Sequence, residues 1–138
     1  MSFILNPTLE KDCFDLGKLK LCRVLLMNDS QFPWLILVPE RAELSEIYQL
    51  SEQDQHTFMQ ESSFVAQQLA ESYLADKMNI AALGNMVPQL HIHHVVRYKS
   101  DKAWPAPIWG QFDAVPYSEE ALIKTLSKIK SALKPLLH

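Results

Sequence analysis

The sequence predicts an α+β fold, a mostly antiparallel sheet with helices packed on one face. Short apolar, β-branched runs occur in two pairs, and each pair is joined by a short turn, as in antiparallel hairpins. Two longer segments with apolar residues at helical spacing follow these pairs, giving the order strand pair, helix, strand pair, helix. The 138 residues suffice for one domain with a substantial core, which we place at residues 1–138.

Composition argues against several classes of protein. The net charge of −3 gives no electrostatic case for binding nucleic acid. No apolar run approaches the length of a membrane span, and residues 1–5 lack the basic and long apolar segments of a signal peptide. The two cysteines are too few for a disulfide framework. We therefore expect a cytoplasmic protein with neither a membrane nor a nucleic-acid partner.

The first part of the chain predicts a short helix and a hairpin. Asn6–Pro7 is typical of a helix start, with asparagine as the cap and proline in the first turn, and Gly17 is placed to end this region. The weak apolar stripe of this helix is Leu9, Cys13 and Phe14. Residues 18–27 and 34–38 predict two strands, which the turn at 28–31 joins into an antiparallel hairpin.

The remainder of the chain predicts two long helices and a second hairpin. Ser51 is typical of a cap for a helix over residues 52–76, whose apolar side chains recur at spacings of seven and four. Residues 79–83 predict a third strand, and the bend at 84–88 leads into a fourth. A final amphipathic helix is predicted over 119–134.

The fourth strand, residues 89–98, contains three of the five histidines. Because side chains alternate along a strand, Gln89, His91 and His93 form a polar row on one face, with Arg97 further along it. Neighbours in such a row are roughly 6–7 Å apart, which lets two imidazoles hold one small anion. One imidazole could attack a phosphorus atom while the other hydrogen-bonds the phosphoryl oxygens or protonates the leaving group.

Other interpretations of the histidines remain open. A His-x-His pair is common zinc geometry, but no acidic residue or cysteine lies near it in the sequence, so we expect no metal ion and no cofactor. The row could also lie on a solvent-facing strand without any function. The rigid Trp-Pro loop that follows the strand argues against this interpretation and favours a binding or catalytic site. His94 points the opposite way, and we expect it to pack beneath the sheet, hydrogen-bonded to a helix or backbone group.

Residues 89–95, Gln-Leu-His-Ile-His-His-Val, resemble the histidine triad (HIT) motif, in which histidines alternate with apolar residues. Gln89 takes the place of the first histidine, and His91 and His93 match the second and third. The resemblance extends to Leu37–Pro39 upstream and to a Trp-Pro segment after the motif. HIT-like hydrolases with glutamine at the first position are the most similar.

The resemblance implies a homodimeric nucleotide-binding hydrolase or nucleotidyl transferase, acting on a phosphoanhydride or phosphoramidate bond. His91 is then the nucleophile, with one ring nitrogen held by the backbone carbonyl of Gln89, and His93 contacts the phosphoryl or leaving group. The substrate contacts that the resemblance implies are Asn85, Asn28, Asp29, Trp104 and Arg97, with Leu25, Leu26 or Phe32 against the base. For these residues, plain turn, packing or solvent-facing roles stay open. The alternative is a non-catalytic nucleotide-binding module, in which Gln89 marks a site that has lost its chemistry.

Overall fold

The structure, a computed structural model, describes residues 2–138, and its centre is a five-stranded sheet of order β1-β2-β3-β5-β4. All neighbouring strands run antiparallel, which confirms the predicted α+β fold class and both predicted hairpins. The strands are β1 (Cys13–Lys18), β2 (Cys22–Met27), β3 (Trp34–Pro39), β4 (Lys77–Ala81) and β5 (Ile92–Arg97). The helices are α1 (Pro7–Asp12), α2 (Glu52–Tyr73) and α3 (Glu119–Leu133), with a 3-10 turn η1 (Ile47–Gln49) before α2.

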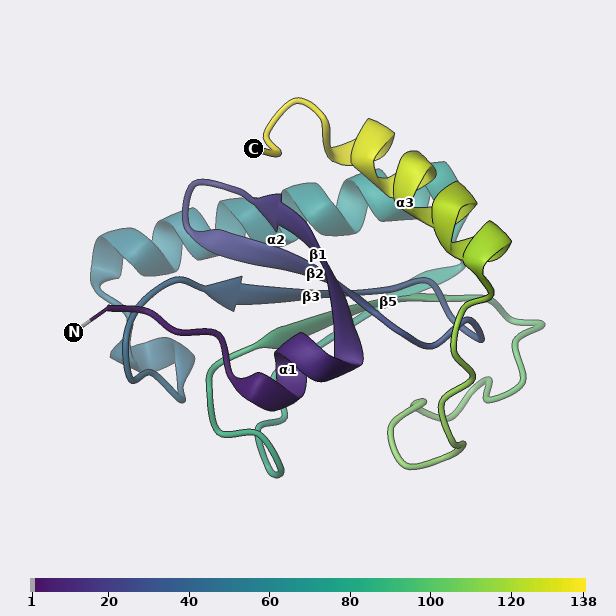
Figure 1. The fold of residues 1–138 in the computed structure, drawn as a ribbon, viewed down its shortest axis with the longest axis horizontal. Helices are drawn as coiled ribbons and strands as arrows, with labels where there is room; N and C mark the ends of the chain where they lie inside the picture. Colours follow the sequence, from purple (N-terminus) through teal and green to yellow (C-terminus); the bar gives the residue numbers. More distant parts are fainter. Residues whose placement is uncertain (1) are drawn as a thin grey trace.

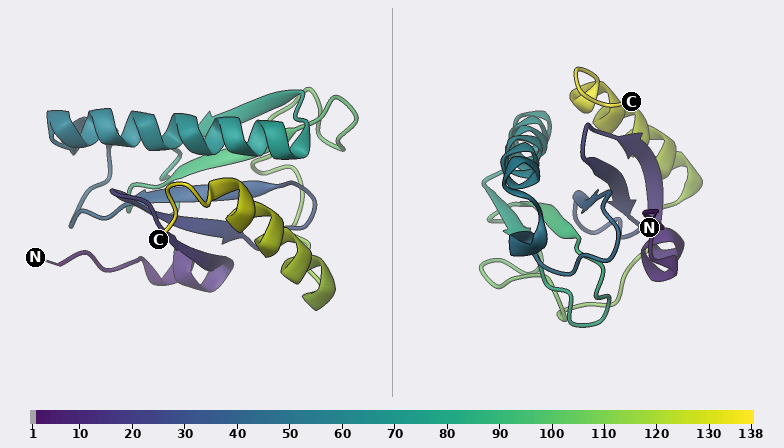
Figure 2. Two further views of the ribbon diagram at one scale, coloured as in Figure 1. Left: turned by 90° about the horizontal axis from the view of Figure 1, so that it is seen from above. Right: turned by 90° about the vertical axis from the view of Figure 1, so that its left-hand side faces the viewer.

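The sheet separates two apolar clusters. In Figure 1 the long helices α2 and α3 lie above the sheet, while α1 and the loop after β5 lie below it. The right-hand view in Figure 2 shows the strands of the sheet between α2 on one side and α1 on the other. The cluster under the long helices includes Val24, Leu35, Val65, Leu69, Ile129 and Leu133. The cluster on the opposite face includes Leu9, Leu25, Ile36, Val38, Val95 and Ile108. The two faces therefore have separate packing partners.

The prediction for residues 13–27 was partly wrong. Cys13 and Phe14 belong to β1 and not to the first helix, because β1 pairs with β2 along its length, from Cys13 opposite Met27 onward. Gly17 lies within β1 at a β-bulge with φ of 112°. A side chain there would also collide with the carbonyl oxygen of His138, so the position requires glycine.

The other predicted elements are present with shifted ends. Ser51 accepts a hydrogen bond from the backbone N–H of Asp54 at 3.1 Å and caps α2, as predicted. The helix ends at Tyr73 because Leu74 adopts a left-handed conformation with φ of 51°. Among residues 2–138, no helix combines the length and the apolar character needed to cross a membrane.

Candidate active site

The two histidines of the polar row lie side by side on the lower face of the sheet. His93 is in β5, opposite Ile36 of β3, and His91 directly precedes the strand. Their ring centroids are 5.1 Å apart with the planes inclined by 68°. His91 is 6% exposed and His93 is 7% exposed. The alternation of the strand thus brings the two rings together in a largely buried position.

His94 lies on the other face of the sheet, as predicted. Its Nε2 is 2.7 Å from the hydroxyl oxygen of Ser62 in α2, and its Nδ1 is 3.1 Å from the carbonyl oxygen of Ile92. A carbonyl oxygen can only accept, so Nδ1 donates and Nε2 accepts from the Ser62 hydroxyl. Burial lowers the pKa of His94 to about 4, so this ring is a neutral packing group.

The orientation of His91 depends on the backbone of Gln89. Nδ1 of His91 lies 2.6 Å from the carbonyl oxygen of Gln89, so Nδ1 carries the proton and Nε2 has a free lone pair. The side-chain amide of Gln89 is engaged elsewhere. It accepts from the backbone N–H of Asn6 and donates to the carbonyl oxygen of Ile4, both at 2.8 Å. Gln89 therefore orients His91 through its main chain and holds the N-terminal segment through its side chain.

Two tryptophans surround the ring of His93. The indole N–H of Trp34, on β3, donates to Nδ1 of His93 at 2.9 Å. The ring of Trp109, from the loop after β5, lies with its centroid 5.5 Å from that of His93. Burial, followed by the neighbouring His91 and His94, lowers the pKa of His93 to about 3. His93 is therefore a neutral imidazole near pH 7.

The loop tryptophan beside the histidines is Trp109, whereas the sequence singled out Trp104. Trp104 packs instead over the guanidinium of Arg97, with 5.6 Å from Cζ to the ring centroid. Both tryptophans lie in one Pro-rich loop, and nothing in their spacing distinguishes them. Trp34 had no sequence signal as a site residue, because its contact with His93 follows from the pairing of β3 with β5.

A cavity of about 140 Å³ lies beside the aromatic cluster. Its wall is apolar and aromatic apart from one carboxylate, and it includes Met27, Asp29, Phe32, Trp34, Ile108, Trp109 and Phe112. Asp29 and Phe32 were both predicted at the site, while Leu25 and Leu26 are not part of this wall. Leu26 packs under the long helices and Leu25 in the lower cluster. Asp29 is buried, and its Oδ1 accepts from the backbone and side-chain N–H groups of Gln31 at 3.0 Å.

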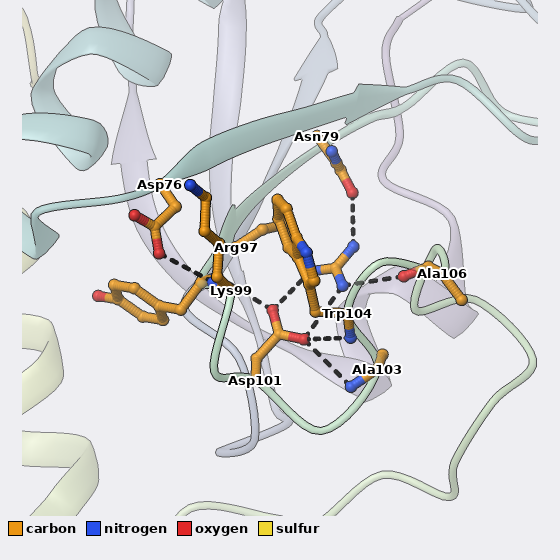
Figure 3. Close-up of polar contacts among 9 residues, drawn as sticks. Asp76, Asn79, Arg97, Lys99, Asp101, Ala103, Trp104 and Ala106 are labelled. Atoms are coloured by element: carbon orange, nitrogen blue, oxygen red, sulfur yellow. Dashed lines mark hydrogen bonds and ion pairs between the residues drawn. The ribbon is translucent and has the colours of Figure 1, made fainter.

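The side chain of Arg97 is buried, and its hydrogen bonds go to residues other than the histidine pair. Figure 3 shows its guanidinium enclosed by protein acceptors. Nε and Nη2 lie 2.8 and 3.1 Å from the carboxylate of Asp101, Nη1 donates to Asn79 at 2.7 Å, and Nη2 donates to the carbonyl oxygen of Ala106 at 2.8 Å. The hydrogen bond from Arg97 is the main cause that lowers the pKa of Asp101 to about 2. Arg97 therefore anchors the loop that also carries Trp109.

Two further predicted residues, Asn28 and Asn85, do not line this cavity. Oδ1 of Asn28 accepts from the backbone N–H of Tyr117 at 2.9 Å and so holds the segment before α3. Asn85 is exposed in the bend before Gln89. Within residues 2–138, no group of three or more His, Cys, Asp and Glu side chains is placed to hold a metal ion.

Comparison with known proteins points to one family. Residues 8–100 match the HIT domain. A solved histidine triad protein from Marinobacter aquaeolei VT8 is 47% identical over 99% of this chain and 99% of that chain, with a TM-score of 0.96. One from Sinorhizobium meliloti 1021 is 43% identical over 95% and 97%, with a TM-score of 0.92. One from Bradyrhizobium japonicum is 39% identical over 96% and 98%, with a TM-score of 0.93. A search of curated proteins gave no match.

Proposed function

The chain belongs to the histidine triad (HIT) family, and from that premise we propose that it is a nucleotide-binding hydrolase or nucleotidyl transferase with His91 as the nucleophile. The observation that carries the proposal is the hydrogen bond from Nδ1 of His91 to the carbonyl oxygen of Gln89. It leaves Nε2 unprotonated, which a nitrogen nucleophile requires. His93 lies next to it as a second polar group for the phosphoryl centre.

The proposed reaction has two displacements at phosphorus. Nε2 of His91 attacks the α-phosphorus of a nucleotide, an N–P bond forms, and the leaving group departs with the bonding electron pair and takes up a proton from solvent. Water then attacks the same phosphorus and returns a proton to solvent, the electron pair of the N–P bond goes back to Nε2 as that bond breaks, and a nucleoside monophosphate is released. In a transferase another hydroxyl or amine replaces the water. The Gln89 carbonyl stabilises the positive charge that develops on the imidazole while the N–P bond exists.

The cavity lined in part by Trp34 and Trp109, the two tryptophans that contact His93, supports a nucleoside as the bound group. Asp29 supplies a carboxylate for the ribose hydroxyls, and Phe32 and the neighbouring aromatic residues supply an apolar slot for the base. Asn85 stays a candidate contact for the phosphoryl group. In this proposal Asn28 and Arg97 do not contact the substrate. Asn28 holds the segment before α3, and Arg97, with Trp104 packed over it, holds the loop after β5.

A substrate panel with matched variants tests the proposal. Nucleoside phosphoramidates and dinucleoside polyphosphates are incubated with the wild type, with His91→Asn, and with His56→Asn, which alters an exposed histidine of α2. We expect turnover by the wild type and by His56→Asn, and a loss of at least about 10²-fold in His91→Asn. Mass spectrometry after acid-free quenching should detect a nucleotidyl adduct on the wild type that His91→Asn lacks. Undiminished turnover in His91→Asn contradicts the proposal.

A non-catalytic nucleotide-binding module is the second candidate. It is favoured by the amide of Gln89 at the first triad position, which cannot titrate and whose hydrogen bonds go to the N-terminal segment. Calorimetry that detects binding of a nucleoside monophosphate, together with no turnover across the panel, would select this candidate. Asp29→Ala should weaken that binding in either case. The expected homodimer stays a prediction, which light scattering on the purified protein tests.

A further inference from the structure

We infer that Trp34 is a positioning residue that keeps the ring proton of His93 on Nε2, so that His93 faces the phosphoryl group as an uncharged hydrogen-bond donor. The catalytic part of this inference rests on the proposed function. The protonation pattern itself does not, because it follows from the contacts of His93 in the protein alone.

The contact between Trp34 and His93 determines which nitrogen is protonated. An indole N–H can donate and cannot accept, and that of Trp34 lies 2.9 Å from Nδ1 of His93. Nδ1 must therefore present a lone pair. A neutral imidazole has one N–H, so the proton lies on Nε2. Trp34 is 8% exposed and His93 7%, so water does not readily replace this bond.

His91 has the opposite protonation pattern. Its Nδ1–H donates to the carbonyl oxygen of Gln89, which leaves its Nε2 bare. The ring centroids are 5.1 Å apart, so an imidazole whose Nε2 is bare lies next to one whose Nε2 carries the proton. If Nε2 of both rings carried a lone pair, His93 would repel the phosphoryl oxygens. If Nε2 of both rings carried a proton, His91 could not act as the nucleophile. The carbonyl of Gln89 and the indole of Trp34 thus give the two rings opposite protonation patterns, and neither ring needs to carry a charge.

The surroundings of His93 also oppose its protonation. A protonated ring carries a hydrogen on both nitrogens, so Nδ1–H would face the N–H of Trp34. The strand positions paired with His93 are Ile36 on β3 and Ala81 on β4, and the loop presents the ring of Trp109. The titratable groups that influence His93 are His91 and His94, and both disfavour a positive charge on it. No carboxylate among these neighbours stabilises an imidazolium.

Nitrogen-15 NMR of histidine-labelled protein measures the protonation pattern directly. In the wild type we expect the correlation pattern of an Nε2–H imidazole for His93 and of an Nδ1–H imidazole for His91. The pattern of His93 should persist from about pH 5 to about pH 8, the window in which an unperturbed histidine titrates, because burial lowers the pKa of His93 to about 3. An Nδ1–H pattern for His93, or its protonation within that window, overturns the inference without any variant.

Two tryptophan variants separate the hydrogen bond from simple packing. Trp34→Phe keeps an aromatic ring but removes the donor, and we expect the Nε2–H pattern of His93 to give way to a mixture of both forms. Trp109→Phe changes the other aromatic neighbour, whose Nε1 is buried and has no hydrogen-bond partner within residues 2–138. We expect it to leave the pattern of His93 unchanged. An unchanged His93 in a folded Trp34→Phe variant, checked by circular dichroism, overturns the inference.

Kinetics on a cleaved substrate completes the test. Loss of one hydrogen bond that orients a catalytic group corresponds to about a tenfold fall in kcat for Trp34→Phe. We expect KM to change by less than kcat, because the donor matters most when charge develops on the phosphoryl oxygens. The expected NMR pattern in a protein that turns over no substrate would refute the proposed function while the assignment of the His93 proton stands.

Discussion

The backbone carbonyl oxygen of Gln89 lies 2.6 Å from Nδ1 of His91, while the side-chain amide of Gln89 bonds to the N-terminal segment. One residue thus connects the candidate nucleophile to the start of the chain. Its two functions are separable by mutation, because truncating the side chain leaves the carbonyl in place.

Gln89→Ala should lower stability more than activity. Two hydrogen bonds to Ile4 and Asn6 are lost, and we expect the free energy of unfolding to fall by about 1–2 kcal/mol. Turnover should fall by less than about tenfold, because the contact to His91 remains. Denaturant unfolding and steady-state kinetics measure the two effects, with the exposed Gln67→Ala as the control. A loss of turnover as large as that of His91→Asn would mean that the Gln89 amide contacts the substrate.

Ser62→Ala should destabilise the protein through His94. The ring is fully buried, and the variant removes the only donor to its Nε2 among the described residues. An unsatisfied buried acceptor costs about 1–3 kcal/mol, which chemical unfolding can resolve. Ser63→Ala is the matched control, because Ser63 is exposed on the same helix and should change stability by less than about 0.5 kcal/mol. Equal effects of the two variants would contradict the assigned role of Ser62.

Stability should fall on acidification from about pH 6.5 toward pH 4. The pKa values of His93 and His94 are lowered to about 3 and about 4, so in this window the unfolded chain binds protons that the folded protein does not. Each group then contributes up to about 1.4 kcal/mol per pH unit. His94→Gln removes one of these groups, and unfolding curves at several pH values should show a shallower slope. An unchanged slope would mean that His94 titrates normally.

Asp101→Asn should destabilise the loop after β5. Arg97 and Asp101 form a buried ion pair with 2% and 8% of their side chains exposed, and the variant leaves the guanidinium without its counter-charge. We expect a loss of about 3 kcal/mol in unfolding experiments, and a change in tryptophan fluorescence because Trp104 packs over Arg97. Glu120→Gln alters an exposed ion pair and should cost less than about 0.5 kcal/mol. Similar costs for both would show that the buried pair does not stabilise the loop.

Local rules were enough to place the triad histidines. The period of two along a strand put His91 and His93 on one face and His94 on the other, and the structure agrees with each assignment. Helix caps and apolar spacing likewise predicted α2 and α3 to within a few residues. These features depend on neighbours in the sequence, so the amino-acid order alone determines them.

Contacts between distant segments were decided only by the tertiary structure. Residues 13–18 became a strand because β2 was available as a pairing partner. Trp34 and His93 are 59 residues apart in the sequence, and the pairing of β3 with β5 brings them into contact. The path of the loop after β5 brings Trp109 to the same ring. Arg97 turned away from the site because Asp101 and Ala106 offered it buried acceptors. Such partners are chosen by packing and by the need to satisfy buried polar groups, and no local sequence pattern records that choice.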